Sequence, residues 1–194
     1  MKIAITGASG LVGSELSSLL KAEGHQVTPV VRHPPKPGEV RWNIQTMEMD
    51  AEGLAGHDAV VHLAGENIAS GRWTAARKRK IRDSRVNGTK LLAGALAKLT
   101  DKPRVLVCAS AIGYYPDSGD KPLTEEAAPG DTFLAEVCQE WEAAAKPAVE
   151  AGIRVVFARF GIILSPKGGA LAKMLTNIPL GRHLVPRLGI YAVA

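Results

Sequence analysis

The sequence predicts a doubly wound α/β fold, with helices on both faces of a mostly parallel β-sheet. Short runs rich in β-branched residues alternate with longer amphipathic stretches along the chain. This alternation is typical of βαβ units, whose parallel strands are joined by right-handed crossovers. A glycine-rich turn between the first run and the first amphipathic stretch fits the same architecture. The 194 residues suffice for one domain with a sizeable core.

The first half of the chain supports this topology element by element. Lys2–Thr6 is the first predicted strand, and Leu11–Glu23 is a helix because its apolar residues recur at 11, 12, 16, 19 and 20, with Gly24 as a C-cap. Gln26–Arg32 is the second strand, and the proline-rich segment Pro34–Gly38 is a loop. The other elements predicted here are a short strand at Val40–Asn43, a weak helical turn near Ala51–Leu54 and a strand at Asp58–Ala64.

The second half repeats the alternation with longer helices. Its predicted elements are a helix at Thr74–Leu99, a strand at Arg104–Ala109, a helix at Asp131–Ala151 and a strand at Ile153–Phe160. After Leu164 the pattern weakens into Ser165–Gly169, and the final segment Leu188–Ala194 is apolar and has no capping residue. We therefore expect the fold to continue beyond this sequence.

Composition and charge narrow the class of protein. With 46% hydrophobic and 22% charged residues, no apolar run of ~18 residues and no secretion signal, the default expectation is a soluble cytoplasmic protein without membrane partners. Cys108 and Cys138 have no metal-ligand spacing, so no metal site is predicted. The net charge is +5, but the one basic cluster, Arg77–Lys80 with Arg82, spreads around a helix. A solvated face is favoured there over an RNA- or DNA-binding patch, and no nucleic-acid partner is expected.

The segment Thr6–Gly13 places three glycines between the first strand and the first helix. Gly7 permits a tight turn, Gly10 lets the backbone approach a pyrophosphate, and Gly13 lets the helix pack closely on the strand. The helix N-terminus adds free N–H groups and a positive dipole. The pattern predicts a Rossmann-type dinucleotide site; a purely structural turn is the alternative. The residues expected to bind the cofactor here are Gly7, Ala8, Ser9, Gly10, Leu11, Val12 and Gly13.

The end of the second strand indicates which dinucleotide is bound. NAD sites usually carry Asp or Glu about 20 residues past the turn, to accept a hydrogen bond from the ribose hydroxyl. This chain has Val31 and Arg32 there, and its next acidic residue is Glu39. An arginine fork can bond two oxygens of a 2′-phosphate. We therefore expect NADP(H), bound with Val31 and Arg32; the alternative is that Arg32 is a solvated strand end.

Further motifs follow in order along the chain. These are His62-Leu63-Ala64-Gly65 after the fourth strand, Arg85-Val86-Asn87-Gly88-Thr89 in the long helix, and Ser110-Ala111-Ile112-Gly113-Tyr114-Tyr115 after the fifth strand. With the glycine turn, this set resembles the extended short-chain dehydrogenase/reductases. The resemblance implies that Leu63, Ala64 and Gly65 lie against the cofactor's adenosine and ribose. Arg85 stands where the family has asparagine, and its guanidinium could pair with the pyrophosphate; a solvated helix face is the alternative.

A closer resemblance is to an atypical subgroup, the epimerase family proteins, some of which are called cell-division-inhibitor-like. Its marks are Leu63–Ile68, Arg72-Trp73, Ser84-Arg85, Trp141–Ala145, Arg159–Leu164 and Gly168–Ala170. The resemblance extends to about Leu180 and places Ile163 among the cofactor-binding residues. It implies an NADP(H)-binding domain over residues 1–164 and the start of an incomplete substrate-side lobe over residues 165–194.

The resemblance also implies a reaction centre from which two residues are missing. In the superfamily a Tyr-x-x-x-Lys pair performs the proton chemistry, because the lysine charge lowers the tyrosine pKa. Ser110 fits the serine that polarises the substrate oxygen, with a plain buried hydroxyl as the alternative. If Glu142 corresponds to the glutamate that follows the lysine, Cys138 and Leu134 occupy the lysine and tyrosine positions. The pair is therefore absent.

Other residues are candidates to replace that pair. Tyr114 or Tyr115 could approach the nicotinamide from the loop after the fifth strand, and Glu66 could act from the loop after the fourth. A half-buried loop aromatic is the alternative for Tyr115, and a surface or helix-capping carboxylate is the alternative for Glu66. Cys138 is not favoured as a nucleophile, since nothing near it in sequence lowers its pKa. The catalytic candidates are thus Ser110, Tyr115 and Glu66.

Together these patterns predict an NADP(H)-dependent oxidoreductase or epimerase-like enzyme that acts on an unknown small carbonyl or sugar-like substrate. The alternative is a regulatory protein that binds NADPH without catalysis, which the missing pair favours. An apolar face left exposed where the rest of the lobe would dock predicts association into a homo-oligomer or poor solubility.

Overall fold

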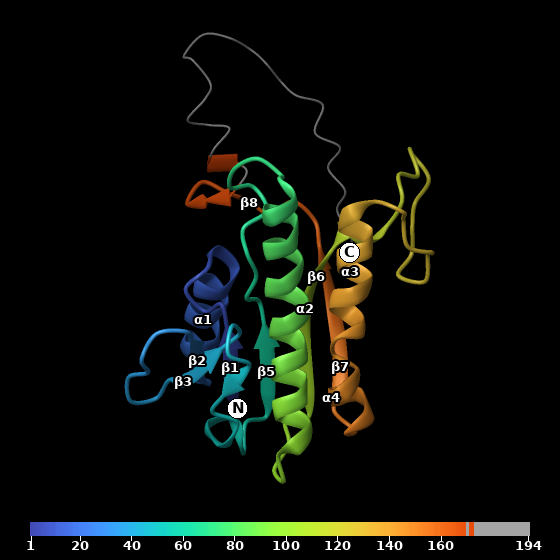
Figure 1. Cartoon of the computed structure of the whole chain (residues 1–194). Helices are drawn as coiled ribbons and strands as arrows, with labels where there is room; N and C mark the ends of the chain where they lie inside the picture. The colour runs from blue at the N-terminus through green and yellow to red at the C-terminus, as the bar shows by residue number, and fades with distance from the viewer. Residues whose placement is uncertain (170, 173–194) are drawn as a thin grey trace. The chain divides into compact units, whose positions relative to one another are not determined.

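The computed structural model describes residues 1–169 and 171–172, in two compact units, Met1–Arg159 and Phe160–Ala194 (Figure 1). In chain order the elements are β1 (Lys2–Thr6), α1 (Leu11–Ala22), β2 (Gln26–Val31), β3 (Val40–Asn43), β4 (Glu48–Met49), η1 (Glu52–Leu54), β5 (Ala59–His62), α2 (Ala75–Lys98), β6 (Val105–Ala111), η2 (Ile112–Tyr114), α3 (Phe133–Ala143), α4 (Lys146–Glu150), β7 (Arg154–Phe160) and β8 (Leu164–Ser165). All but β8 and the last residue of β7 lie in the first unit.

The sheet confirms the predicted doubly wound topology. Its strand order is β4-β3-β2-β1-β5-β6-β7. The pairs β1·β2, β1·β5, β2·β3 and β5·β6 are parallel, and only the short β4 is shown running antiparallel to its neighbour. The chain moves outward from β1 through β2 and β3, then returns to the other side of β1 with β5. The order of the strands therefore reverses between β1 and β5, where open α/β sheets bind their ligands.

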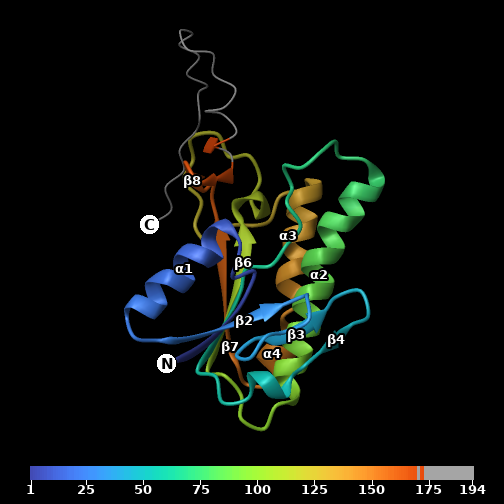
Figure 2. The same cartoon turned by 90° about the vertical axis from the view of Figure 1, so that its left-hand side faces the viewer.

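Helices cover both faces of the sheet, as the sequence predicts (Figure 2). Successive side chains of a strand point to opposite faces, and β1 shows this directly. Ile3 and Ile5 pack with Leu16 and Leu20 of α1. The intervening Ala4 belongs to the larger core, which includes Leu92, Leu96 and Leu99 at α2 and Ala148 in α4. The alternating side chains of β1 thus contribute to an apolar layer with α1 on one face of the sheet and to another with α2 and α4 on the other face.

The predicted helix at Asp131–Ala151 is wrong as a single element, because the structure has two helices there. Helix α3 ends at Ala143 and α4 begins at Lys146, with Pro147 in its first turn. Proline has no N–H, so Pro147 cannot donate the hydrogen bond that Ala143 would accept in a continuous helix. A proline in a first turn costs nothing, since that N–H has no helical partner.

Two other boundaries differ from the sequence analysis. The two-residue strand β4 was not predicted; it pairs with Trp42 and Asn43 of β3 through a turn that includes Met47 in the left-handed region (φ 56°). A two-residue strand is too short to show a periodic pattern. Strand β6 extends to Ala111 rather than ending at Ala109, so Ser110 lies within the strand. Ser110 is buried there, at 3% exposed.

Two predicted helix ends agree well with local chemistry. Helix α1 ends next to Gly24, which has a φ of 80° and donates from its N–H to the carbonyl of Lys21. Thr74 is the N-cap of α2, and its side chain accepts from the N–H of Arg77 at 3.2 Å. Both agree with the usual preferences for glycine after a helix and a hydroxyl before one.

The second unit is described here by itself. Within it, Leu164 and Ser165 form antiparallel bridges with Gly169 and Gly168, which makes a tight hairpin. The predicted domain boundary at residue 164 falls inside this unit. Most of the predicted substrate-side lobe, residues 165–194, lies outside the described residues.

Candidate functional site

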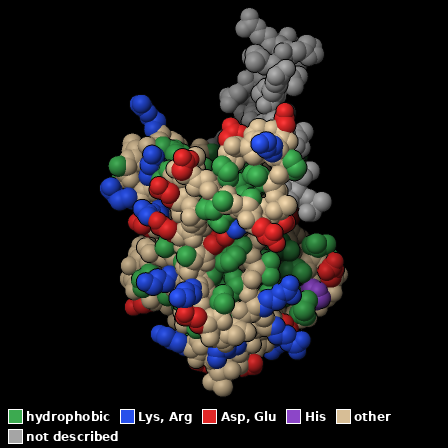
Figure 3. Space-filling model, turned by 90° about the vertical axis from the view of Figure 1, so that its right-hand side faces the viewer, with side chains coloured by type: hydrophobic (Ala, Val, Ile, Leu, Met, Phe, Trp, Pro, Cys, Tyr) green, Lys and Arg blue, Asp and Glu red, His purple; other side chains and the backbone are tan. Residues whose placement is uncertain are grey.

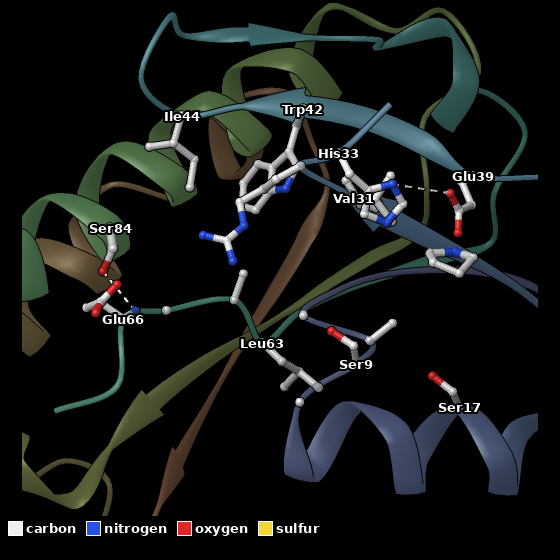
Figure 4. Close-up of a pocket in the computed structure, with 18 of the residues that line it drawn as sticks. Ser9, Ser17, Val31, His33, Glu39, Trp42, Ile44, Leu63, Glu66 and Ser84 are labelled. Carbon is white, nitrogen blue, oxygen red and sulfur yellow. Dashed lines mark hydrogen bonds and ion pairs between the residues drawn. The ribbon is translucent and has the colours of Figure 1, made fainter. Parts of the chain in front are cut away.

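A cavity of about 1060 Å³ lies at the carboxyl ends of β1, β2 and β5, beside the point where the strand order reverses (Figure 4). Its lining residues are Gly7, Ala8, Ser9, Gly10, Ser17, Lys21, Val27, Pro29, Val30, Val31, Arg32, His33, Glu39, Trp42, Ile44, Gln45, Leu63, Ala64, Gly65, Glu66, Asn67 and Ser84. A volume of this size accommodates a ligand much larger than a sugar. Both its place and its walls of glycine and apolar side chains are those of a dinucleotide site.

The glycine turn forms one wall of the cavity through backbone rather than side chains. Gly7 has a φ of 71°, and a Cβ there would lie 3.0 Å from the backbone nitrogen of Ala64. Gly10 donates to the carbonyl of Gly7 at 2.9 Å and is the N-cap of α1, without a side-chain cap. A Cβ on Gly13 would lie 2.9 Å from Cα of Ala8. The three glycines thus allow the turn, the neighbouring loop and the helix N-terminus to approach each other closely, which leaves N–H groups available to phosphate.

A buried pair, Thr6 and His62, joins this turn to the loop after β5. Oγ1 of Thr6 accepts from the backbone N–H groups of Leu63 and Ala64, both at 3.2 Å, and lies 2.6 Å from Nδ1 of His62. Because two donors occupy its lone pairs, the hydroxyl must donate to Nδ1, which places the imidazole proton on Nε2. The ring is also in edge contact with Trp42, at 5.7 Å between centroids. The pair therefore ties the loop after β5, which lines the cavity, to the end of β1.

We expect His62 to make the protein less stable at mildly acidic pH. Burial lowers the pKa of its imidazole from 6.5 to about 4. The folded state therefore resists protonation while the unfolded state takes up a proton, and stability present above pH 6.5 is lost as the pH falls toward 4. The contribution between pH 7 and pH 5 is about 2 kcal/mol. Urea unfolding should show that His62→Asn reduces the pH dependence by that amount, whereas His33→Asn, at an exposed histidine, should not. Equal slopes in all three proteins would contradict this.

The end of β2 brings charged groups to the rim of the cavity. Val31 and Arg32 both line it, and Arg32 is exposed. Glu39 also lines it, but its carboxylate accepts from the backbone N–H of Lys36 at 2.9 Å and lies 3.9 Å from His33. Figure 4 shows Trp42 and Ile44 on the side of the cavity opposite Ser9. The one nearby carboxylate is thus engaged within its own loop, while the arginine side chain remains exposed.

Glu66 lines the cavity beyond Gly65, where α2 holds it in place. Its carboxylate pairs with Arg77 at 2.6 Å and with Lys80 at 3.7 Å. The hydrogen bond from Arg77 is the largest cause that lowers the pKa of Glu66. A carboxylate stabilised in this way is a poor proton acceptor, which weakens its case as a catalytic base.

A second polar cluster lies at the carboxyl ends of β6 and β7, apart from the residues that line the cavity. Ser110 donates to Oε1 of Glu142 at 2.6 Å. Arg159 forms a two-bond pair with Glu142, from Nε at 2.9 Å and from a terminal nitrogen at 2.8 Å. Its other terminal nitrogen donates to the hydroxyl of Tyr115 at 2.7 Å. The guanidinium also lies 3.7 Å from the ring centroid of Tyr114. Residues from a strand end, a loop, a helix and a second strand thus form one connected network.

Comparison with known proteins shows the family. The profile of the NAD dependent epimerase/dehydratase family matches residues 3–188. The chain belongs to this family. An epimerase family protein of Mycobacterium bovis is 43% identical over 185 residues, which make up 94% of this chain and 61% of that protein. The chain thus spans about three fifths of the length of that relative.

Solved structures agree with this assignment. A nucleoside-diphosphate sugar epimerase from Corynebacterium glutamicum is 44% identical, with a TM-score of 0.79 over 91% of this chain and 37% of that one. The human epimerase family protein SDR39U1 (isoform 2), solved with NADPH, is 35% identical, with a TM-score of 0.79 over 91% of this chain and 59% of that one. The predicted Rossmann-type fold and the predicted resemblance are both confirmed.

In this epimerase-family chain, the predicted cofactor-binding residues fall into three groups. Those on the cavity are Gly7, Ala8, Ser9, Gly10, Val31, Arg32, Leu63, Ala64 and Gly65. Leu11, Val12 and Gly13 form the first turn of α1 behind it. Arg85 lies outside the lining and is half-buried; it donates to the carbonyls of Glu66 and Ile81 and lies over the ring of Trp141. Arg85 is therefore not a solvated helix face, and its contact with pyrophosphate stays a prediction, as does that of Ile163 in the second unit.

The residues that the resemblance places at the Tyr-x-x-x-Lys positions are Leu134 and Cys138. Leu134 lies against Gly113, because a Cβ added to Gly113 would lie 3.3 Å from the Cβ of Leu134. Cys138 is buried beside the carbonyl of Ala111, and burial raises the pKa of its thiol. Neither side chain replaces a tyrosine or a lysine. The thiol is also unsuited to act as a nucleophile, as the sequence analysis expects.

Most side chains of the basic cluster of α2 contact acidic or aromatic side chains of the same protein. Arg77 and Lys80 hold Glu66, Arg82 pairs with Glu140, and Lys78 lies over the ring of Phe133. Figure 3 shows one face on which Lys and Arg are interspersed with acidic and apolar side chains. Pairing of this kind gives no support to a nucleic-acid patch.

Sequence reasoning did not predict the pair between Glu142 and Arg159. Both residues belong to motifs that carry the family resemblance, but they are 17 positions apart and no spacing rule joins them. Trp42, Ile44 and Gln45 of the cavity were missed for a similar reason, since their place depends on how β3 packs.

Among the described residues, no cluster of His, Cys, Asp and Glu could hold a metal ion, and no helix is long and apolar enough to cross a membrane.

Proposed function

We propose that this chain binds NADP(H) in the cavity between β1, β2 and β5, as part of an epimerase-family oxidoreductase that acts on a small carbonyl or sugar-like substrate. The observation that carries the choice of cofactor is the end of β2. Arg32 is exposed on the cavity, whereas Glu39 is engaged by Lys36 and His33. NADPH in the solved human relative supports the same choice.

The chain's own residues divide the work of binding. The backbone turn Gly7–Gly10 and the N-terminus of α1 provide N–H groups for the pyrophosphate. Leu63 and Ile44 provide apolar contact for the adenosine part, and Arg32 provides the charge for the 2′-phosphate. The glycine geometry fits such a group, because any Cβ at Gly7 would meet the loop after β5. When bound, NADPH supplies the hydride for reduction.

The cofactor choice is tested by titration with both dinucleotides, followed by the fluorescence of the reduced nicotinamide. We expect NADPH to bind about tenfold or more tightly than NADH, a difference of about 1.4 kcal/mol. Arg32→Ala should weaken NADPH binding by a similar factor and leave NADH unchanged, because only the phosphate contact is lost. Arg41→Ala, at an exposed arginine on β3 outside the cavity lining, should change neither. Equal affinities of the unsubstituted chain for both cofactors would contradict the proposal.

A further inference from the structure

We propose that Arg159 and Glu142 position the reaction centre, so that Tyr115 donates the proton to a substrate oxygen and Ser110 acts as a hydrogen-bond acceptor. This rests on the proposed oxidoreductase function. In the superfamily pattern, a tyrosine and a lysine on one helix perform the proton transfer. Here we assign that transfer to a tyrosine and an arginine from two separate elements.

The hydrogens of Arg159 determine the arrangement. Its Nε and one terminal nitrogen donate to the two carboxylate oxygens of Glu142. The other terminal nitrogen donates to the hydroxyl of Tyr115 and to the carbonyl of Glu125. The side chains of Arg159 and Glu142 are 17% and 12% exposed. A guanidinium bonded through all three nitrogens in a mostly buried site is rigid, so it holds both of its side-chain partners in place.

The Arg159–Glu142 pair positions Ser110, whose hydroxyl hydrogen is used in a hydrogen bond to Glu142. The hydroxyl donates to Glu142, and the same carboxylate oxygen also accepts from Nε of Arg159. A carboxylate with no proton can only accept, so the hydroxyl must be the donor. What Ser110 offers to a ligand is then lone pairs, which can accept from a hydroxyl of a sugar-like substrate but make no hydrogen bond with the carbonyl oxygen that is reduced. This differs from the sequence-based expectation that Ser110 polarises a carbonyl oxygen by donating to it.

Tyr115 has the opposite hydrogen-bonding role, because its oxygen accepts and its hydrogen is left to donate. Its oxygen accepts from Arg159, and within the described residues the structure gives its hydroxyl hydrogen no acceptor. That hydrogen is available to a substrate oxygen. The cation that donates to the phenol oxygen also stabilises the negative charge left there after the proton has moved. A lysine beside a tyrosine provides the same stabilisation, although here the positive charge comes from β7 rather than from the helix that follows β6.

The position in the fold suits this role. Ser110 is the residue before the last of β6, and Arg159 is the residue before the last of β7, at the edge where parallel strands of such sheets meet their ligands. Strand β6 is the neighbour of β5, whose following loop lines the cavity. In reduction, the carbonyl carbon gains the hydride of NADPH, which leaves as NADP⁺, and the carbonyl oxygen gains the proton of Tyr115. The O–H bond of Tyr115 breaks, and the phenolate regains a proton from water.

The test uses the full chain with NADPH and two carbonyl probes, 4-nitrobenzaldehyde and 2,3-butanedione. Tyr115→Phe should lower kcat by about 100-fold, the usual effect of losing a general acid, with KM and NADPH affinity unchanged. Ser18→Ala removes a hydroxyl on the exposed face of α1, outside both the cavity lining and this network, and should stay within about threefold of the unsubstituted chain. Arg159→Lys keeps the charge but loses the fork, and should retain more activity than Arg159→Met.

A second readout does not depend on turnover. In NMR spectra of ¹⁵N-labelled protein, the guanidinium signals of Arg159 should shift in Tyr115→Phe and stay in place in Ser18→Ala, a change on the exposed face of α1. Unchanged kcat in Tyr115→Phe would overturn this proposal alone, whereas a complete lack of probe reduction by the unsubstituted chain with NADPH bound would also contradict the proposed oxidoreductase. Failure to bind NADPH would instead overturn the proposed function, so the two failures are distinguishable.

Discussion

Replacing Gly13 by alanine is expected to abolish tight NADP(H) binding and to destabilise the chain severely. The added Cβ would lie 2.9 Å from Cα of Ala8 and closer still to the carbonyl oxygen of Gly7. Both neighbours are backbone atoms, which cannot rotate away as the end of a side chain could. Relief therefore requires α1 to move off β1, which opens the turn and separates Leu16 and Leu20 from the sheet. Overpacking typically costs about 1–3 kcal/mol, and contact with backbone atoms favours the upper end of that range.

Urea unfolding and NADPH titration measure the two parts of this effect. Gly94→Ala is the matched control, because Gly94 lies in α2 with nothing within 4 Å of an added Cβ beyond its own helix. That substitution should stabilise the protein by up to about 1 kcal/mol, the difference between glycine and alanine in a helix. A Gly13→Ala protein that unfolds at the normal urea concentration and binds NADPH normally would show that the close approach of turn and helix is not needed.

Replacing Arg159 by methionine is expected to be the other most damaging substitution. It leaves the carboxylate of Glu142 mostly buried, with the hydroxyl of Ser110 as its one remaining side-chain donor among the described residues. Removing one partner of a buried ion pair usually costs about 3–5 kcal/mol, and the slight exposure of both side chains favours the lower end. Glu142→Gln should cost less than Arg159→Met, because glutamine can still accept from Arg159 and Ser110.

A double-mutant cycle separates the pair from its surroundings. Combining Arg159→Met with Glu142→Gln should cost clearly less than the sum of the single changes, since no charge is then left unpaired. The exposed pair Lys146–Glu150, with side chains 74% and 63% exposed, is the control, and Lys146→Met should change stability by no more than about 0.5 kcal/mol. Additive effects for Arg159 and Glu142 would mean that the two side chains do not stabilise each other.

Local chemistry made much of the fold predictable. The strands β1, β2 and β3 and the helices α1 and α2 lie within about two residues of their predicted bounds, because β-branched runs, a glycine after α1 and a threonine before α2 act over short stretches. The same locality explains why the glycine turn was recognised. Its function depends on three glycines within seven positions, and each is required by the conformation of its own neighbours.

The candidate site was predicted less completely, since half of its interactions join distant segments. Glu66 was a candidate base from its position after β5, but its pairing with Arg77 and Lys80 depends on how α2 packs beside that loop. Arg85 was expected either at a phosphate or in solvent, whereas it lies over Trp141 of α3. No spacing in the sequence indicates which of several arginines meets a given carboxylate.

The sequence by itself determined the doubly wound fold, the glycine turn of a dinucleotide cavity and the presence of Arg32 at the rim of that cavity. These follow from backbone conformation and from position at a strand end, which are local properties. Only the tertiary structure decided which side chains meet across strand ends. It brings Arg159 of β7 to Glu142 of α3 and to Tyr115, which follows β6, because β6 and β7 are neighbours in the sheet although they are far apart along the chain.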